Sequence, residues 1–143
     1  MNRKNNGYTL VETILVLGIL GIIGLLIFPK FSFVKSYQEN LEIKEIVYHL
    51  KSCKSKSLRE HKPYTFFCNE KSYGFRNDKG STIFEENYKS LSFDISSPRK
   101  EITFNPKGRP DMESAGKIYL NGTRKYIIII TPVTGSIRWE SEN

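Results

Sequence analysis

The most apolar stretch of the chain covers residues 8–28, where only two threonines and Glu12 interrupt the run of apolar residues and glycines. As a helix it would be roughly 30 Å long, about the thickness of the hydrocarbon core of a bilayer. Arg3 and Lys4 precede it, so we expect the N-terminus to remain cytoplasmic and the rest to face outward. The pattern therefore predicts a single membrane-spanning helix.

The same stretch can also be read as a secretory signal peptide, which is cut at a small-residue site after its apolar core. Here the stretch ends in Phe28-Pro29-Lys30-Phe31, which offers no such site. It is also long for the apolar part of a signal peptide. These features favour a membrane-spanning helix over a cleaved signal peptide.

The segment from Ser32 to about Arg59 has the pattern of an amphipathic helix. Its apolar residues recur near helical spacing, with Lys and Glu between them, and Pro63 closes the helical region. Such a stripe favours packing of the helix on a sheet. The stripe consists of Val34, Tyr37, Leu41, Ile43, Ile46, Val47, Leu50 and Cys53.

From Tyr64 onward the pattern is that of short strands separated by turns. Asn121-Gly122 indicates a hairpin, and the wholly apolar residues 126–130 are typical of a buried central strand. We expect an α+β fold in which a long N-terminal hydrophobic helix packs on a C-terminal antiparallel β-sheet domain. The expected strands cover residues 64–68, 73–75, 82–84, 91–95, 101–105, 117–120, 124–130 and 136–139.

Glu12 is the anomaly of the apolar stretch, because a carboxylate inside a membrane span costs on the order of a few kcal/mol at its centre and less near an end. Thr9 and Glu12 have the T-x-x-E spacing of a capping box, in which both side chains satisfy free N–H groups of the first helical turn. Capping by itself does not explain why Gly7 stands directly before the bulky Tyr8, behind a basic leader.

Together these residues resemble the N-terminal signal of type IV prepilins and pseudopilins. Gly7 matches the last leader residue, Tyr8 replaces the usual Phe as first mature residue, and Glu12 is the fifth mature residue. Gly21 and Pro29 stand where those helices usually have a glycine and a proline. The resemblance implies cleavage after Gly7 by a prepilin peptidase, methylation of the Tyr8 amine, and assembly into a filament. There Glu12 would pair with the N-terminal amine of a neighbouring subunit, so that two charges costly in lipid neutralise one another.

The resemblance divides the chain into a leader peptide (1–7), a transmembrane and assembly helix (8–29) and a pilin-like globular domain (30–143). That domain would lie in the periplasm or outside the cell, on a membrane anchor and then on a filament. The implied partners are other pilin or pseudopilin subunits, the prepilin peptidase and the membrane. Gly21 and Pro29 weaken the helix between them, so we expect it to melt locally on assembly. A kinked but intact helix is the alternative for the isolated protein.

The C-terminal part resembles minor pseudopilins of the GspH/FimT type. The resemblance rests on ITFNPKGRPD, on Gly116 before KIYL, and on RKYIIIITPVTGSIRW. It implies a long helix packed on a β-rich domain and a minor position in the filament. The machine would be a type II secretion system, a competence pilus or a type IV pilus. A single-pass anchored binding protein that never polymerises is an alternative of another class.

DNA is the alternative partner, because some FimT-like minor pilins bind it through a C-terminal G-R-x-R motif. Here residues 135–138 read G-S-I-R, so a serine replaces the first arginine. The net charge of +7 suits an anionic partner, and phosphate contacts would be salt-sensitive. A solvated basic face is the other interpretation. The possible DNA patch consists of Lys107, Arg109, Arg124, Lys125 and Arg138.

The sequence contains no Gly-rich phosphate loop, nucleophile elbow or H-E-x-x-H motif, so we expect no enzymatic activity and no cofactor. His49, Cys53, His61 and Cys68 could in principle ligate zinc, but their spacing matches no usual zinc finger, and we expect no metal site. A Cys53–Cys68 disulfide suits a domain outside the cytoplasm. A pair of buried thiols is the alternative in a reducing environment.

Overall fold

The computed structural model describes residues 9–27, 30–112 and 115–142. The chain divides into two compact units, Met1–Val34 and Lys35–Asn143. The first contains helix α1 (Leu10–Ile27) and the start of helix α2 (Lys30–Glu60). The second contains the rest of α2 and all the strands.

Eight strands make up the β region of the second unit. They are β1 (Tyr64–Cys68), β2 (Ser72–Asn77), β3 (Thr82–Asn87), β4 (Ser92–Phe93), β5 (Glu101–Phe104), β6 (Gly116–Asn121), β7 (Lys125–Ile130) and β8 (Ile137–Glu142). Each expected strand is present, with ends shifted by up to three residues. The α+β fold is confirmed.

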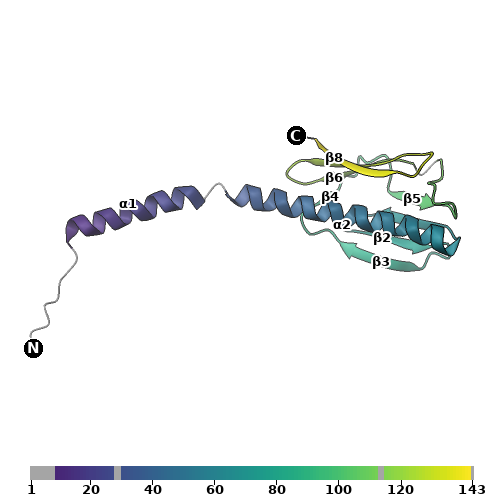
Figure 1. Cartoon of the computed structure of the whole chain (residues 1–143), viewed down its shortest axis with the longest axis horizontal. Coiled ribbons are helices and arrows are strands. Elements are labelled where there is room, and N and C mark those ends of the chain that lie inside the picture. The colour runs from purple at the N-terminus through teal and green to yellow at the C-terminus, as the bar shows by residue number, and fades with distance from the viewer. Residues whose placement is uncertain (1–8, 28–29, 113–114, 143) are drawn as a thin grey trace, which may run out of the picture. The chain divides into compact units, whose positions relative to one another are not determined.

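The strands form two antiparallel sheets rather than one. The first has the order β3-β2-β1-β5 and the second β4-β6-β7-β8. In the first sheet β1 pairs with β5 so that Tyr64 lies opposite Phe104. Figure 1 shows α2 running along both sheets. One helix face can therefore contribute to a core shared by the two sheets.

The core lies between α2 and the sheets. Ile43, Ile46, Leu50 and Cys53 of α2 are fully buried there, at spacings of three and four residues that place them on one helix face. The other end of the predicted stripe behaves differently: Val34, Tyr37 and Leu41 are exposed. These three residues lie on another face of α2, because a helix turns by 3.6 residues and the stripe mixed two faces.

The second sheet contains the predicted central strand and hairpin. β7 lies between β6 and β8, and its residues Tyr126 and Ile128 are fully buried. Asn121 pairs with Lys125, so the hairpin predicted at Asn121-Gly122 is present, with residues 122–124 as its turn. Both predictions are confirmed.

Candidate functional site

The N-terminal motif is described from Thr9 onward, and Gly7 and Tyr8 lie outside the described residues. Thr9 precedes the first residue of α1. The Glu12 N–H donates to Thr9 Oγ1 at 3.3 Å, and the Thr9 N–H donates to Glu12 Oε2 at 3.3 Å. These reciprocal bonds form a capping box that starts the helix. The local interpretation of the T-x-x-E spacing is thus realised.

Capping uses only one oxygen of the Glu12 carboxylate. Oε2 accepts from the Thr9 N–H and also from Thr9 Oγ1, at 3.4 Å. Oε1 accepts no hydrogen bond from any residue in the described part of the chain. Since Glu12 is exposed, its second oxygen can accept a charged donor from outside the chain while the cap stays intact.

Beyond the cap, α1 is continuous through Gly21 to Ile27, and Pro29 lies outside the described residues. The apolar side chains between residues 10 and 25 of α1, including Leu10, Leu17 and Leu25, are exposed. Within the described residues, no helix combines the length and the hydrophobicity needed to cross a membrane.

The five basic residues proposed as a DNA patch fall into two groups, which lie near two different places on α2. Arg124 donates to Asn40 Oδ1 at 3.3 Å, whereas Lys54 Nζ donates to the carbonyl of Gly135 at 2.8 Å. Asn40 and Lys54 are about 21 Å apart at the usual helical rise. The hairpin turn with Arg124 therefore lies far from the β7–β8 turn.

The remaining members of the patch distribute between these two places. Lys125 is next to Arg124 and pairs with Asp94, with 3.2 Å between Nζ and Oδ2. Arg109 shares a shallow pocket with residues 132–133 of the β7–β8 turn, and Lys107 is two residues away from it. Arg138 pairs across the sheet with Ile129, next to the same turn. The five residues do not form one continuous patch.

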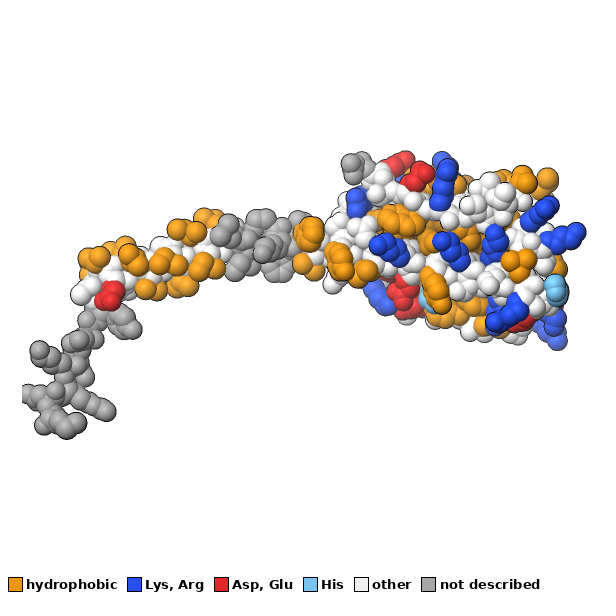
Figure 2. All heavy atoms as spheres, in the orientation of Figure 1, with side chains coloured by type: hydrophobic (Ala, Val, Ile, Leu, Met, Phe, Trp, Pro, Cys, Tyr) orange, Lys and Arg blue, Asp and Glu red, His pale blue; other side chains and the backbone are white. Residues whose placement is uncertain are grey.

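A different set of basic side chains lines a groove of about 460 Å³ between α2 and β8. Lys44 and Lys51 come from α2 and Arg138 from β8, and Tyr48 and Trp139 add aromatic surface. Figure 2 shows Lys and Arg side chains beside exposed hydrophobic ones on the face that α2 crosses. Sequence reasoning identified Arg138 alone, because Lys51 and Lys44 lie 87 and 94 positions before it.

Cys53 and Cys68 are both buried and both present as free thiols. Burial raises the pKa of each thiol to about 12, although contact with Tyr88 acts in the opposite direction on Cys68. Of the two alternatives drawn from the sequence, the structure contains the pair of buried thiols.

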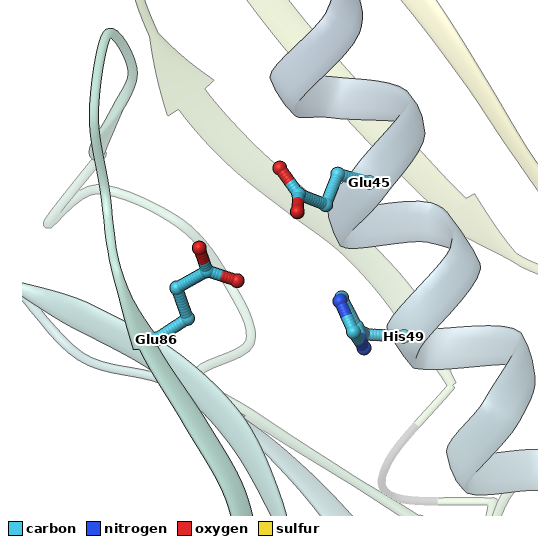
Figure 3. Close-up of side chains that lie close together, drawn as sticks. All are labelled: Glu45, His49 and Glu86. Atoms are coloured by element: carbon cyan, nitrogen blue, oxygen red, sulfur yellow. The ribbon is translucent and has the colours of Figure 1, made fainter.

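His49 lies beside two carboxylates, those of Glu45 and Glu86 (Figure 3). One ligand atom from each of Glu45, His49 and Glu86 can be chosen so that all three lie within 4.8 Å of one another. Burial lowers the pKa of His49, while Glu45 and Glu86 act against that shift. The set of His49, Cys53, His61 and Cys68 considered from the sequence is not brought together as a metal cluster among the described residues.

Comparison with known proteins finds a match for the N-terminal segment and another for the fold. Residues 2–28 match the family model of the prokaryotic N-terminal methylation motif. A crystal structure of the type IV minor pilin FimU from Pseudomonas aeruginosa superposes with a TM-score of 0.62 at 12% identity, covering 78% of this chain and 97% of that one. A second FimU crystal structure gives 0.57 at 13% identity, covering 70% and 94%. The chain therefore combines the N-terminal methylation motif with the fold of this minor pilin. No curated protein sequence matches it significantly.

Two buried glutamates of this pilin-like domain escaped sequence reasoning. Glu39 accepts hydrogen bonds from Thr123 in the β6–β7 turn, and Glu42 accepts three from the backbone N–H groups of residues 89–91, at 2.6–3.0 Å. From the sequence, both glutamates look like residues on the polar face of an amphipathic helix. The available signal was their position: Glu39 lies four residues before Ile43, on the buried face.

Proposed function

We propose that this protein is a non-enzymatic structural subunit of a type IV pilus-like filament, as a minor pilin or pseudopilin. The observation that carries the proposal is the N-terminal methylation motif at residues 2–28 in a chain whose folded part has the fold of a minor pilin. The filament would belong to a type II secretion system, a competence pilus or a type IV pilus.

The proposal includes a maturation step. A prepilin peptidase cuts after Gly7, removes the leader 1–7 and methylates the new amine of Tyr8. Residues 8–29 then hold the protein in the cell membrane, with the globular domain 30–143 outside, until the subunit enters the filament. Gly21 and Pro29 would mark the part of the helix that extends on assembly.

The geometry at Thr9 supports a second role for Glu12 beyond capping. A carboxylate engaged through one oxygen retains the other for the N-terminal amine of a neighbouring subunit, so the cap and the ion pair are compatible. In lipid, such a pair removes two costly charges at once and fixes the axial register of the subunits.

Exposed apolar side chains on α2 also support helix packing between subunits. Tyr37, Leu41 and Tyr48 are all exposed, on a helix whose opposite face is the core of the domain. A filament built around its helices would cover these side chains together with the apolar surface of α1.

The experiment compares three variants for incorporation into filaments in cells. Glu12→Gln retains the capping geometry but removes the charge. Thr9→Val removes the Thr9 Oγ1 half of the capping box but keeps the charge, and Glu12→Ala removes the charge together with the carboxylate half of the box. We expect both Glu12 variants to fail and Thr9→Val to assemble. Incorporation of Glu12→Ala at the normal level would refute the role of Glu12 and favour an anchored protein that does not polymerise.

Maturation is tested by the intact mass and N-terminal sequence of protein recovered from its native membrane. The expected chain begins at a methylated Tyr8. A chain that still begins at Met1 in cells containing the peptidase would contradict the proposal, and one that begins beyond Phe28 would indicate an ordinary secreted domain.

DNA capture is the second candidate function, favoured by the groove between α2 and β8. Lys44, Lys51 and Arg138 would contact phosphates while Tyr48 and Trp139 stack on bases, the usual combination for single-stranded DNA. We expect binding with a steep salt dependence that weakens in Lys51→Ala and Arg138→Ala. Lys79→Ala, in the exposed β2–β3 turn, is the matched control. Equal loss in all three variants would indicate nonspecific attraction and argue against a site in the groove.

A further inference from the structure

We propose that Glu45, His49 and Glu86 form a binding site for one divalent transition-metal ion, with Zn²⁺ as the best fit. The site combines one imidazole with two carboxylates. It lies where α2 faces β3, and none of its three residues lines the groove between α2 and β8.

The backbone places the three side chains toward one point. Glu45 and His49 are four residues apart and therefore one turn apart on the same face of α2. Glu86 lies on β3, where it pairs with Tyr73 of β2 and shares a strand face with Phe84. Figure 3 shows the three side chains extending from the helix and the strand into a common space.

The imidazole ring of His49 is held in position by aromatic neighbours. It stacks on Phe84 with ring centroids 3.9 Å apart and planes at 15°, and Tyr48 makes an edge contact at 5.3 Å. No hydrogen bond within the described part of the chain uses a ring nitrogen of His49.

The donor set suits zinc in particular. Zn²⁺ takes His nitrogen and carboxylate oxygen at about 2.0–2.2 Å, which puts tetrahedral ligand atoms about 3.4 Å apart. The ligand atoms here lie within 4.8 Å of one another, so side-chain rotation of the two glutamates closes the site. Three protein ligands leave a fourth position for water. Harder ions such as Mg²⁺ prefer all-oxygen sites and fit less well.

Lys89 is the competitor for this site. Its Nζ lies 2.7 Å from Glu86 Oε1 and 3.4 Å from Glu45 Oε2, so one ammonium group already pairs with both carboxylates. Tyr73 adds a hydrogen bond to Glu86 Oε2 at 3.3 Å. Since the Lys89 side chain is 60% exposed, it can leave for solvent when a metal ion arrives. Metal binding therefore exchanges one cation for another.

The test is a titration of the full-length protein in detergent micelles with ZnSO₄ by calorimetry, repeated with Co²⁺ to record its visible absorption. We expect one ion per chain, with nitrogen and oxygen ligation in the cobalt spectrum. Glu86→Gln and His49→Gln should weaken binding more than about tenfold. Glu85→Gln, whose side chain lies on the opposite strand face and bonds to Ser72, is the matched control and should leave binding unchanged.

Lys89→Met separates this site from unspecific zinc binding elsewhere. Removal of the competing ammonium should tighten zinc binding by several-fold, whereas a site at His61 or at the cysteines would not respond. The proposal is refuted if the full-length protein binds no zinc, if Lys89→Met leaves the affinity unchanged, or if Glu86→Gln binds as tightly as the parent. The Glu86 and Lys89 variants alter side chains that are 28% and 60% exposed, so the result does not depend on whether His49→Gln folds.

Discussion

The carboxylate of Glu39 accepts two hydrogen bonds from Thr123, which lies 84 positions further along the chain. The Thr123 N–H donates to Oε1 at 2.8 Å and the Thr123 hydroxyl donates to Oε2 at 2.6 Å. The Tyr126 hydroxyl donates to the same Oε2 at 3.3 Å. One fully buried side chain of α2 therefore holds the β6–β7 hairpin, just as Glu42 holds the segment before β4.

Replacement of Glu39 by Ala should destabilise the domain by about 3 kcal/mol. The change leaves the buried Tyr126 hydroxyl without this acceptor, at a cost of about 1–3 kcal/mol, and also removes the two hydrogen bonds from Thr123 in the exposed turn. Urea unfolding of the full chain in detergent measures the effect. Trp139, the single tryptophan, packs beside Tyr126 and reports unfolding of the domain.

Two comparisons separate this effect from a general loss of charge. Glu140→Ala removes an exposed carboxylate on β8 and should change the free energy of unfolding by less than about 0.5 kcal/mol. The double variant Glu39→Ala with Thr123→Ala should cost less than the sum of the single changes, since both remove the same contact. Strict additivity would contradict the direct coupling of the two residues.

Gly122→Ala should destabilise the domain by about 1–3 kcal/mol through overpacking. An added Cβ would lie 2.7 Å from Glu39 Cδ and 2.9 Å from Leu91 Cδ2. In the Glu39→Ala background the cost should fall, because the carboxylate that it meets is gone. Thermal or urea unfolding of the single and double variants gives both values.

Gly80→Ala is the control for that experiment. Gly80 has a φ of +79° in open space, so alanine there costs about 1 kcal/mol through backbone strain alone. Its cost should be the same with and without Glu39. If Gly122→Ala also cost the same in both backgrounds, steric contact with Glu39 would not be its cause.

Alkylation at pH 8 should leave both cysteines unmodified in the folded protein. Thiolates are the reactive species, and a pKa of about 12 leaves about one thiol in ten thousand ionised at that pH. In urea both thiols should react, as counted by mass spectrometry. Labelling of neither thiol in urea, with a mass lower by two hydrogens, would instead indicate the Cys53–Cys68 disulfide.

The same thiols predict a loss of stability at alkaline pH. Their folded-state pKa values of about 12 exceed the ordinary value of 9.0, so the unfolded chain ionises first. The contribution of the two thiols to the free energy of unfolding is complete below pH 9. It decreases as the pH rises toward 12, by about 1.4 kcal/mol per thiol at pH 10. Burial also raises the pKa of Tyr73 and Tyr88, which extends the loss above pH 10.

Unfolding midpoints in urea at pH 8, 9 and 10 test this prediction. Cys53→Ala should reduce the slope between pH 9 and pH 10 by about half, because only one buried thiol remains. A midpoint that does not change over this range would contradict the protection of the thiols by burial.

The sequence by itself determined the local elements of this protein. Residues 64–68 are bounded by Pro63 and a polar turn, and β1 has those same bounds. The apolar run 126–130 became the central strand β7, and the T-x-x-E spacing became the capping box at Thr9. Each of these features depends on periodicity or hydrogen bonding within a few residues, so the chain specifies it locally.

Only the tertiary structure decided which distant residues meet. The pairing of Tyr64 with Phe104 places β5 beside β1 in the first sheet. Thr123, in the β6–β7 turn, donates a hydrogen bond to Glu39. Tertiary packing also brings Glu45, His49 and Glu86 together and keeps Arg124 apart from Arg138. Contacts between α2 and the strands depend on which helix face packs and on the register of each sheet. A buried glutamate and a solvated one have the same letter in the sequence, and the packing of the helix distinguishes them.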